Sequence, residues 1–156
     1  MKTLILGLGN SIRCDDGVGN RVAQALEEEF HGSSVKVMEA NADGLALLDL
    51  LPGYDRAIII DAIETPQGTP GQIYRLDKQE LISYDYAPTT HNIGIGTALQ
   101  LGTKLGIPLP EEVIIFAVEV GDIISFSQEL TPQVEEAVPR VIELILQEVA
   151  QKSPEH

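Results

Sequence analysis

The run of four apolar residues at 57–60 (Ala-Ile-Ile-Ile) is the feature that most restricts how this chain can fold. A strand that faces water on one side alternates apolar and polar residues, and this run does not alternate. Both of its faces must therefore be covered, which is typical of the inner strands of a parallel sheet. Apolar runs of the same kind at residues 3–6 and 113–118 predict two more buried strands.

Three other stretches repeat apolar residues at helical spacing: residues 17–30, 89–105 and 131–150. The last begins with Thr131 and Pro132, and a capping hydroxyl followed by a proline in the first turn is a strong signal for a helix start. Shorter elements are predicted at residues 35–38 (strand), 43–51 (helix) and 72–76 (strand). The alternation of strands and helices indicates the α/β class, as a three-layer α/β/α sandwich around a mostly parallel (mixed), twisted sheet of about five strands.

Length and composition restrict the class of protein further. A chain of 156 residues fits one domain over residues 1–156, and with no Trp and only 3 Phe its core must be aliphatic. The one cysteine, Cys14, cannot form an internal disulfide and fits a reducing compartment. The N-terminal apolar stretch is too short for a signal peptide, and no apolar run reaches the length of a membrane span. We therefore expect a soluble, cytoplasmic protein that is monomeric and has no membrane partner.

The charge of the chain argues against one class of partner. Its 24 acidic and 10 basic residues leave a formal net charge of −14, and no three basic residues are adjacent. Such a surface repels a phosphate backbone, so we expect no nucleic-acid partner. Solubility is the simpler explanation of the charge, and complementarity to a basic partner segment is the second.

Three polar residues follow predicted strands where a ligand would bind. In sheets of this class, ligands lie at the carboxyl ends of the strands. Asp16 follows the first strand, Asp61 ends the central strand, and His91 opens a later helix. Two carboxylates and one imidazole suit a divalent metal such as nickel or zinc. With a coordination position left open, such a site can polarise a carbonyl group or a water molecule.

Each of these residues also has a structural interpretation. Asp16 could stabilise a helix start through the helix dipole, and His91 could cap its helix. Asp61 is the strongest candidate, because a carboxylate directly after a buried strand is unfavourable unless it is paired or coordinated. Cys14 could be a nucleophile, but the sequence places no base beside it, so we expect it to take no part in the chemistry.

The loop after the first strand contains Gly7-Leu8-Gly9-Asn10, which partly matches a dinucleotide-binding fingerprint. The third glycine of that fingerprint would fall at Ile12, so the match fails and we expect no nicotinamide or flavin. The glycines are better explained as letting the loop turn sharply and approach something closely.

The same residues resemble the hydrogenase maturation endopeptidase family. Gly7-Leu8-Gly9-Asn10 and then Asp15-Asp16-Gly17-Val18-Gly19 look like the N-terminal signature of that family. Ile60-Asp61-Ala62 resembles its central strand, and the Thr-rich loop with His91 resembles its histidine loop. Order and spacing agree over residues 1–149.

The resemblance implies a reaction and a partner. These enzymes cut a C-terminal extension from the large-subunit precursor of a nickel-iron hydrogenase after nickel has been inserted. The residues that bind the metal and act in catalysis in that family correspond to Asp16, Asp61 and His91 here. Nickel would arrive with the substrate, and no organic cofactor is implied. One stretch departs from the family: residues 39–44 (Glu-Ala-Asn-Ala-Asp-Gly) replace a pattern like Asp-Gly-Gly-Thr. The sequence therefore does not identify which hydrogenase is the substrate.

Two alternatives are weighed against this interpretation. Peptidyl-tRNA hydrolases also carry GLGN after a strand and an HNxG element like the one at residues 91–94. Here the two elements lie too far apart for that family, and the acidic charge opposes tRNA binding. A metal-sensing maturation chaperone that binds without cutting is the other alternative, because the sequence shows no obvious nucleophile. Water activated by Asp16 or by the metal is the attacking group that we expect.

Overall fold

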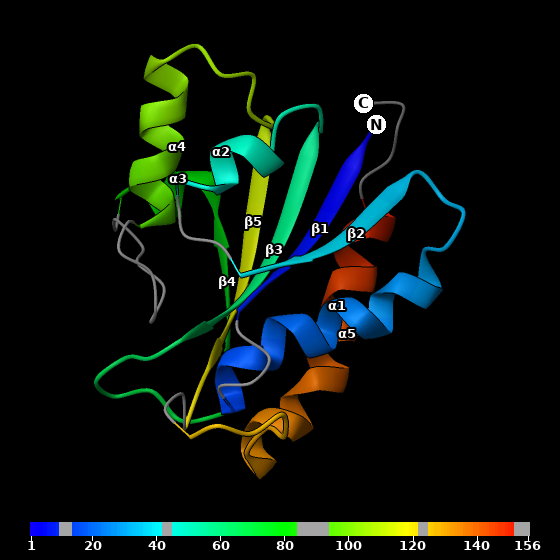
Figure 1. The fold of residues 1–156 in the computed structure, drawn as a ribbon, viewed down its shortest axis with the longest axis vertical. Helices are drawn as coiled ribbons and strands as arrows, with labels where there is room; N and C mark the ends of the chain where they lie inside the picture. Colours follow the sequence, from blue (N-terminus) through cyan, green and yellow to red (C-terminus); the bar gives the residue numbers. More distant parts are fainter. Residues whose placement is uncertain (10–13, 42–44, 84–93, 122–124, 152–156) are drawn as a thin grey trace.

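The computed structural model describes residues 1–9, 14–41, 45–83, 94–121 and 125–151, and its centre is a twisted sheet (Figure 1). The strands are β1 (Thr3–Leu8), β2 (Val35–Ala40), β3 (Arg56–Ile63), β4 (Ile73–Asp77) and β5 (Glu112–Glu119). Their order across the sheet is β2-β1-β3-β5-β4. All neighbouring strands are parallel except β4, which lies antiparallel to β5 at the edge. The predicted mixed, mostly parallel sheet of five strands is confirmed.

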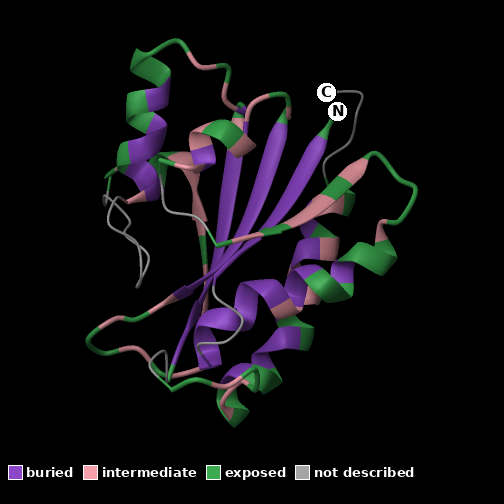
Figure 2. Ribbon diagram, viewed as in Figure 1, coloured by how far each residue is buried: buried purple, intermediate pink, exposed green. Residues whose placement is uncertain are grey.

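The inner strands are buried on both faces, as the apolar run in β3 predicts (Figure 2). Successive side chains of a strand point to opposite faces of the sheet. Ile58 and Ile60 accordingly pack in one hydrophobic cluster, whereas Ala57 and Ile59 pack in the other. The alternation divides the core into two layers, one on each face of the sheet.

Helices cover both faces of this sheet (Figure 1). On one face lie α1 (Val18–Glu29) and α5 (Pro132–Gln151), whose apolar residues share a cluster with Ile58 and Ile60. On the other lie α2 (Leu47–Leu50), α3 (Lys78–Ser83) and α4 (Ile95–Lys104). The three-layer α/β/α architecture is therefore confirmed, and α5 begins at the proline that the sequence marks as a helix start.

Several boundaries differ from the sequence-based prediction. A short 3₁₀ helix, η1 (Cys14–Gly17), precedes α1 and carries both acidic residues of the Asp15–Asp16 pair. The helix predicted at residues 43–51 is reduced to α2 in the described part of the chain, and the cap predicted at Asp43 lies outside the described residues. The helix predicted to open at residues 89–92 is described only from Ile95 onward. α3 was not predicted, because six residues are too few to show a helical period.

None of the described helices is both long enough and apolar enough to cross a membrane.

Candidate functional site

Three glycines bring the start of α1 against the backbone of the sheet. A Cβ atom on Gly19 would lie 2.5 Å from the carbonyl oxygens of both Ile60 and Leu8. A Cβ atom on Gly7 would lie 2.2 Å from the carbonyl oxygen of Gly19. Contacts this short exclude any side chain at these positions. The close approach expected from the glycines is confirmed, and its target is the backbone of the protein itself.

The turn after β1 is equally tight. Gly9 has a φ of 143°, and a Cβ atom there would lie 2.0 Å from the carbonyl oxygen of Asp16. The turn therefore folds directly onto η1. This packing holds Asp16 near the carboxyl end of β1, on the side of the central strand β3.

Asp61 lies in β3, where it pairs with Ala117 of β5, and its side chain is only 1% exposed. Its Oδ1 accepts a hydrogen bond from the backbone N–H of Ala62 at 2.8 Å. Its Oδ2 is buried and has no hydrogen-bond partner among the residues that the structure describes. Burial, and to a lesser extent the nearby charge of Asp16, raises the pKa of Asp61 well above its usual range, while the Ala62 bond opposes the shift.

The structure thus brings together two of the three predicted site residues. Asp16 is 1% exposed in η1, and it lies close enough to Asp61 in β3 for its charge to raise the pKa of that carboxyl group. His91 lies outside the described residues, so its place relative to the pair stays a prediction. Among the residues whose positions are described, no group of three or more His, Cys, Asp or Glu could hold a metal ion. A metal bound by Asp16 and Asp61 would need a further ligand from elsewhere in the chain or from a substrate.

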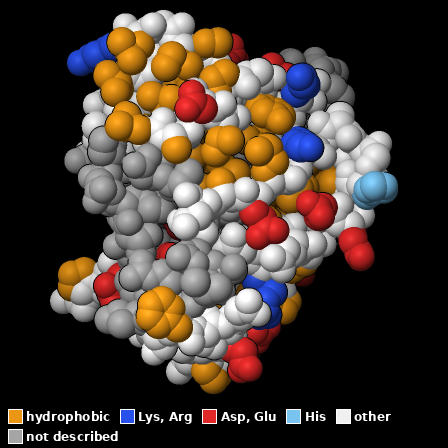
Figure 3. Space-filling view, viewed as in Figure 1, with side chains coloured by type: hydrophobic (Ala, Val, Ile, Leu, Met, Phe, Trp, Pro, Cys, Tyr) orange, Lys and Arg blue, Asp and Glu red, His pale blue; other side chains and the backbone are white. Residues whose placement is uncertain are grey.

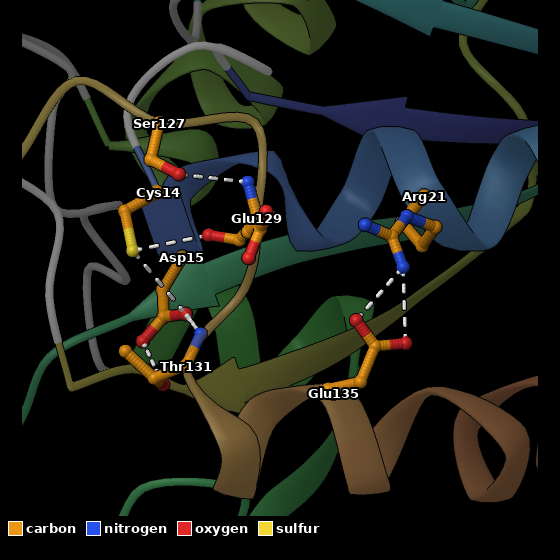
Figure 4. Close-up of polar contacts among 7 residues, drawn as sticks. All are labelled: Cys14, Asp15, Arg21, Ser127, Glu129, Thr131 and Glu135. Carbon is orange, nitrogen blue, oxygen red and sulfur yellow. Dashed lines mark hydrogen bonds and ion pairs between the residues drawn. The ribbon is translucent and has the colours of Figure 1, made fainter.

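Asp15 has a different role from its neighbour (Figure 4). Its carboxylate accepts hydrogen bonds from the N–H and the hydroxyl of Thr131, at 2.7 and 2.6 Å, and from the N–H of Gly121 at 2.8 Å. The residue is fully buried. Asp15 therefore joins η1 to the chain between β5 and α5, and the two acidic residues that look alike in sequence are distinguished by their contacts.

Cys14 also contacts the chain that precedes α5 (Figure 4). Its backbone N–H donates to the carbonyl oxygen of Ser127 at 2.9 Å, and its thiol donates to the carbonyl oxygen of Glu129 at 3.3 Å. The side chain is 6% exposed. A thiol that is buried and hydrogen-bonded in this way has little access to a scissile peptide, which supports the expectation that Cys14 takes no part in the chemistry.

Sequence analysis overlooked a fourth buried carboxylate, at the carboxyl end of β5. Glu119 ends β5, is 1% exposed, and accepts hydrogen bonds from the N–H and hydroxyl of Thr65 at 2.7 and 2.8 Å. The hydroxyl of Tyr74 donates to it at 3.1 Å. Like Asp61, Glu119 follows a continuous apolar run, and that pattern could have identified it. Its contacts fix the loop between β3 and β4.

The chemistry available at this edge follows from the environments of Asp16 and Asp61. A buried carboxyl group with a raised pKa stays protonated to a higher pH than an exposed one and can serve as a proton donor. The same group can release its proton to water when a divalent cation binds, because the cation replaces the proton as the stabilising charge. The buried Oδ2 of Asp61 is suited to coordinate a cation, since the cation would satisfy this oxygen.

Comparisons with known proteins agree with one another. A family model described as hydrogenase maturation protease matches residues 20–148. A putative hydrogenase maturation protease of Methanocaldococcus jannaschii is 31% identical over 94% of this chain and 95% of its own length. The hydrogenase 2 maturation protease of Escherichia coli is 26% identical over 94% of this chain and 89% of its own length. The structure of the E. coli hydrogenase maturating endopeptidase HybD superposes with a TM-score of 0.84 at 25% identity, covering 97% and 93% of the two chains.

Proposed function

The chain belongs to the hydrogenase maturation protease family, and on that premise we propose that it removes a C-terminal extension from the large-subunit precursor of a nickel-iron hydrogenase after nickel has been inserted. The relatives are peptide-bond hydrolases by name, so the class of the enzyme follows from the family. The nickel requirement and the position of the cut are the parts that we add. Both rest on the resemblance to this family, and the nickel requirement is also compatible with the chemistry of the site residues.

The observation that carries the proposal is the environment of Asp61. Asp61 is 1% exposed, lies next to Asp16, and has no described hydrogen-bond partner for Oδ2. A buried carboxylate of this kind is unfavourable unless a cation compensates its charge. Nickel enters as part of the substrate, with Asp16, Asp61 and His91 as the residues that bind it. Carboxylate and imidazole ligands are compatible with Ni²⁺.

The residues of the site also supply the elements of a hydrolytic reaction. Nickel next to the scissile bond would polarise its carbonyl group and favour attack by water. Asp16 is the group that we assign as general base for that water. Asp61, whose raised pKa favours the protonated form in the free enzyme, would lose its proton when nickel arrives. Cleavage would therefore depend on the metal, and a precursor without nickel would be left uncut.

The remaining assignments concern setting and partners. The single cysteine, Cys14, is buried as a free thiol, which is consistent with the cytoplasm as the place of action. We assign the hydrogenase precursor as the partner of a monomeric enzyme, with no nucleic acid, no membrane and no organic cofactor.

A direct assay tests this function. The purified chain is incubated with a nickel-loaded large-subunit precursor, and the mass of the precursor is followed over time. The expected result is a loss of mass equal to a C-terminal peptide, with the same precursor lacking nickel left intact as the control. Binding without a change of mass would contradict the protease assignment and favour a chaperone. Equal cleavage of the nickel-free precursor would contradict the nickel requirement.

A further inference from the structure

A cavity of about 280 Å³ lies beside the candidate site and is not used by the proposed chemistry. It lies between the start of α1 and the chain that precedes α5, and its lining residues are Gly17, Asn20, Arg21, Gln24 and Gln128. Gly17 directly follows Asp16, so the cavity is continuous with the turn that carries the candidate site.

The lining of the cavity is polar and made mostly of uncharged side chains. Three of its five residues are carboxamides, which donate and accept hydrogen bonds as peptide groups do. The charge of Arg21 is matched by Glu135, whose two carboxylate oxygens lie 2.9 and 3.0 Å from Nη1 (Figure 4). The carboxylate of Glu39 accepts hydrogen bonds from Asn20 and Gln24, so the surroundings of the lining carry a negative charge. Such a lining suits the N–H groups of a partner's main chain better than an anionic group.

Asn20 provides a specific binding group in this lining. The residue is 7% exposed, and its Nδ2 donates to Glu39 at 3.1 Å. Its Oδ1 is buried and has no hydrogen-bond partner within the described part of the chain. A buried amide oxygen that lacks a partner is unfavourable, which makes Asn20 the lining residue with unused hydrogen-bonding capacity.

Phe126 adds an apolar contact next to the cavity. It is 82% exposed, more than any other large hydrophobic side chain described, and it lies two residues before the cavity residue Gln128. The chain around it is fixed, because Cys14 binds the carbonyl oxygen of Ser127 and Asp15 binds Thr131. An aromatic residue whose backbone is fixed before binding has less conformational freedom to lose on contact, and aromatic residues are typical interface anchors.

The other exposed hydrophobic residues lie elsewhere. Figure 3 shows hydrophobic side chains gathered over α4 and α2, where Leu101 and Leu105 are 39% and 65% exposed. Leu105 is the C-cap of α4, which leads toward the start of β5. The starts of the parallel strands lie at the opposite end of the sheet from Asp16 and Asp61. Leu105 therefore provides a matched control for Phe126.

We propose that the cavity and Phe126 form a docking surface for the hydrogenase precursor, with an extended stretch of precursor main chain in the cavity and an apolar side chain against the ring of Phe126. This inference rests on the proposed function, which supplies the partner. The surface lies next to Asp16, so a segment bound there is held beside the group that is assigned to activate water. Docking adds recognition of the polypeptide to recognition of the metal.

Photocrosslinking tests the surface independently of cleavage. Phe126 is replaced by p-benzoylphenylalanine in the full chain, which is mixed with nickel-loaded precursor and irradiated, and Leu105 is replaced in the same way as a control. A crosslink to the precursor from position 126, several times stronger than from position 105, is expected. Equal crosslinks, or none from position 126 while the chain cleaves the precursor, would overturn the docking surface. A crosslink from position 126 without any cleavage would contradict the protease assignment and leave the docking surface supported.

Steady-state kinetics provide the second measurement. Phe126→Ala is expected to raise KM for the precursor about tenfold with kcat changed less than about twofold, because the ring binds substrate and does no chemistry. Gln128→Ala should raise KM about threefold for the loss of one hydrogen bond to the main chain. Leu105→Ala should match the wild type in both constants. A fall in kcat without a rise in KM for Phe126→Ala would overturn the assignment.

Discussion

Burial, together with the nearby charge of Asp16, holds the pKa of Asp61 well above its usual range. Asp16 follows β1 and Asp61 lies within β3, and the packing of Gly19 against the carbonyl oxygens of Leu8 and Ile60 brings the start of α1 against both strands. Two carboxyl groups placed in this way resist being charged at the same time. A cation would relieve this repulsion, which is the physical reason behind the proposed metal binding.

The first prediction concerns the proposed metal-binding residues. Asp61→Asn, Asp16→Asn and His91→Ala should each lower the rate of precursor cleavage by at least about a hundredfold, because each removes a ligand or a base. Circular dichroism should show an intact fold for each variant. The matched control is Asp49→Asn, the same change at an exposed position of α2, which should cleave at the normal rate. Normal cleavage by all three site variants would remove these residues from the mechanism.

The second prediction is the dependence of stability on pH. The unfolded chain ionises Asp61 near its ordinary pKa of about 3.9, whereas the folded chain keeps it protonated to a higher pH. The stability that this group contributes is complete below the unfolded pKa and is lost as pH rises toward the folded pKa, at up to about 1.4 kcal/mol per pH unit.

Urea unfolding at a series of pH values, with a chelator present, measures this contribution. The free energy of unfolding of the wild type should fall relative to that of Asp61→Asn as pH rises above about 4, because asparagine does not ionise. Parallel curves for the two proteins would show that the carboxyl group is not held protonated by the fold.

The third prediction separates Asp15 from Asp16. Asp15→Ala removes the fully buried acceptor of the hydrogen bonds from Gly121 and Thr131, and should lower the free energy of unfolding by about 3 kcal/mol because two partly buried backbone N–H groups and one hydroxyl lose their partner. Thr131→Val removes one of these bonds and should cost about 1 kcal/mol. Chemical denaturation measures both values. A loss for Asp15→Ala that is no larger than that for Thr131→Val would contradict the role of Asp15 as the residue that joins η1 to the chain before α5.

The fourth prediction tests the close approach of α1 to the sheet. Gly19→Ala would place a methyl group 2.5 Å from two carbonyl oxygens and should cost about 2–3 kcal/mol, because backbone atoms cannot move aside easily. It should also reduce cleavage, since α1 and η1 would shift relative to Asp61. Gly102→Ala in α4 is the control, because its nearest atoms are the ends of the Leu48 and Leu109 side chains. Thermal unfolding should show little change for Gly102→Ala, and an equal cost at both positions would refute the argument.

The fifth prediction concerns Cys14. Removal of a catalytic nucleophile lowers kcat by about 10⁴-fold or more. Cys14→Ser keeps a hydrogen-bond donor for the carbonyl oxygen of Glu129 and should therefore fold and cleave at close to the normal rate. The assay is precursor cleavage followed by mass. A folded variant without activity would restore the thiol as the attacking group.

Local patterns in the sequence were sufficient for the architecture. The continuous apolar run in β3 predicted a strand buried on both faces, and the structure places its residues in two separate core clusters. Thr131 and Pro132 predicted the start of α5. These features are readable because periodicity, caps and turns depend on residues close together in the chain. Elements too short to show a period, such as α3, were missed for the same reason.

The site was only partly readable. Asp61 was identified correctly as a buried carboxylate, because a charge that follows an apolar strand is unusual in any fold. The same argument applies to Glu119, which sequence analysis did not consider. The metal-binding roles of Asp16, Asp61 and His91, and their place in cleavage, stay predictions.

The sequence by itself determined which segments are strands and helices, the class of the fold, and the burial of Asp61. Only the tertiary structure decided that Asp15 joins η1 to Gly121 and Thr131, and that Asp16 lies next to Asp61. The physical reason is distance along the chain. Periodicity acts between neighbouring residues, whereas one carboxylate finds its partners more than a hundred residues away only after the sheet and its covering helices have formed.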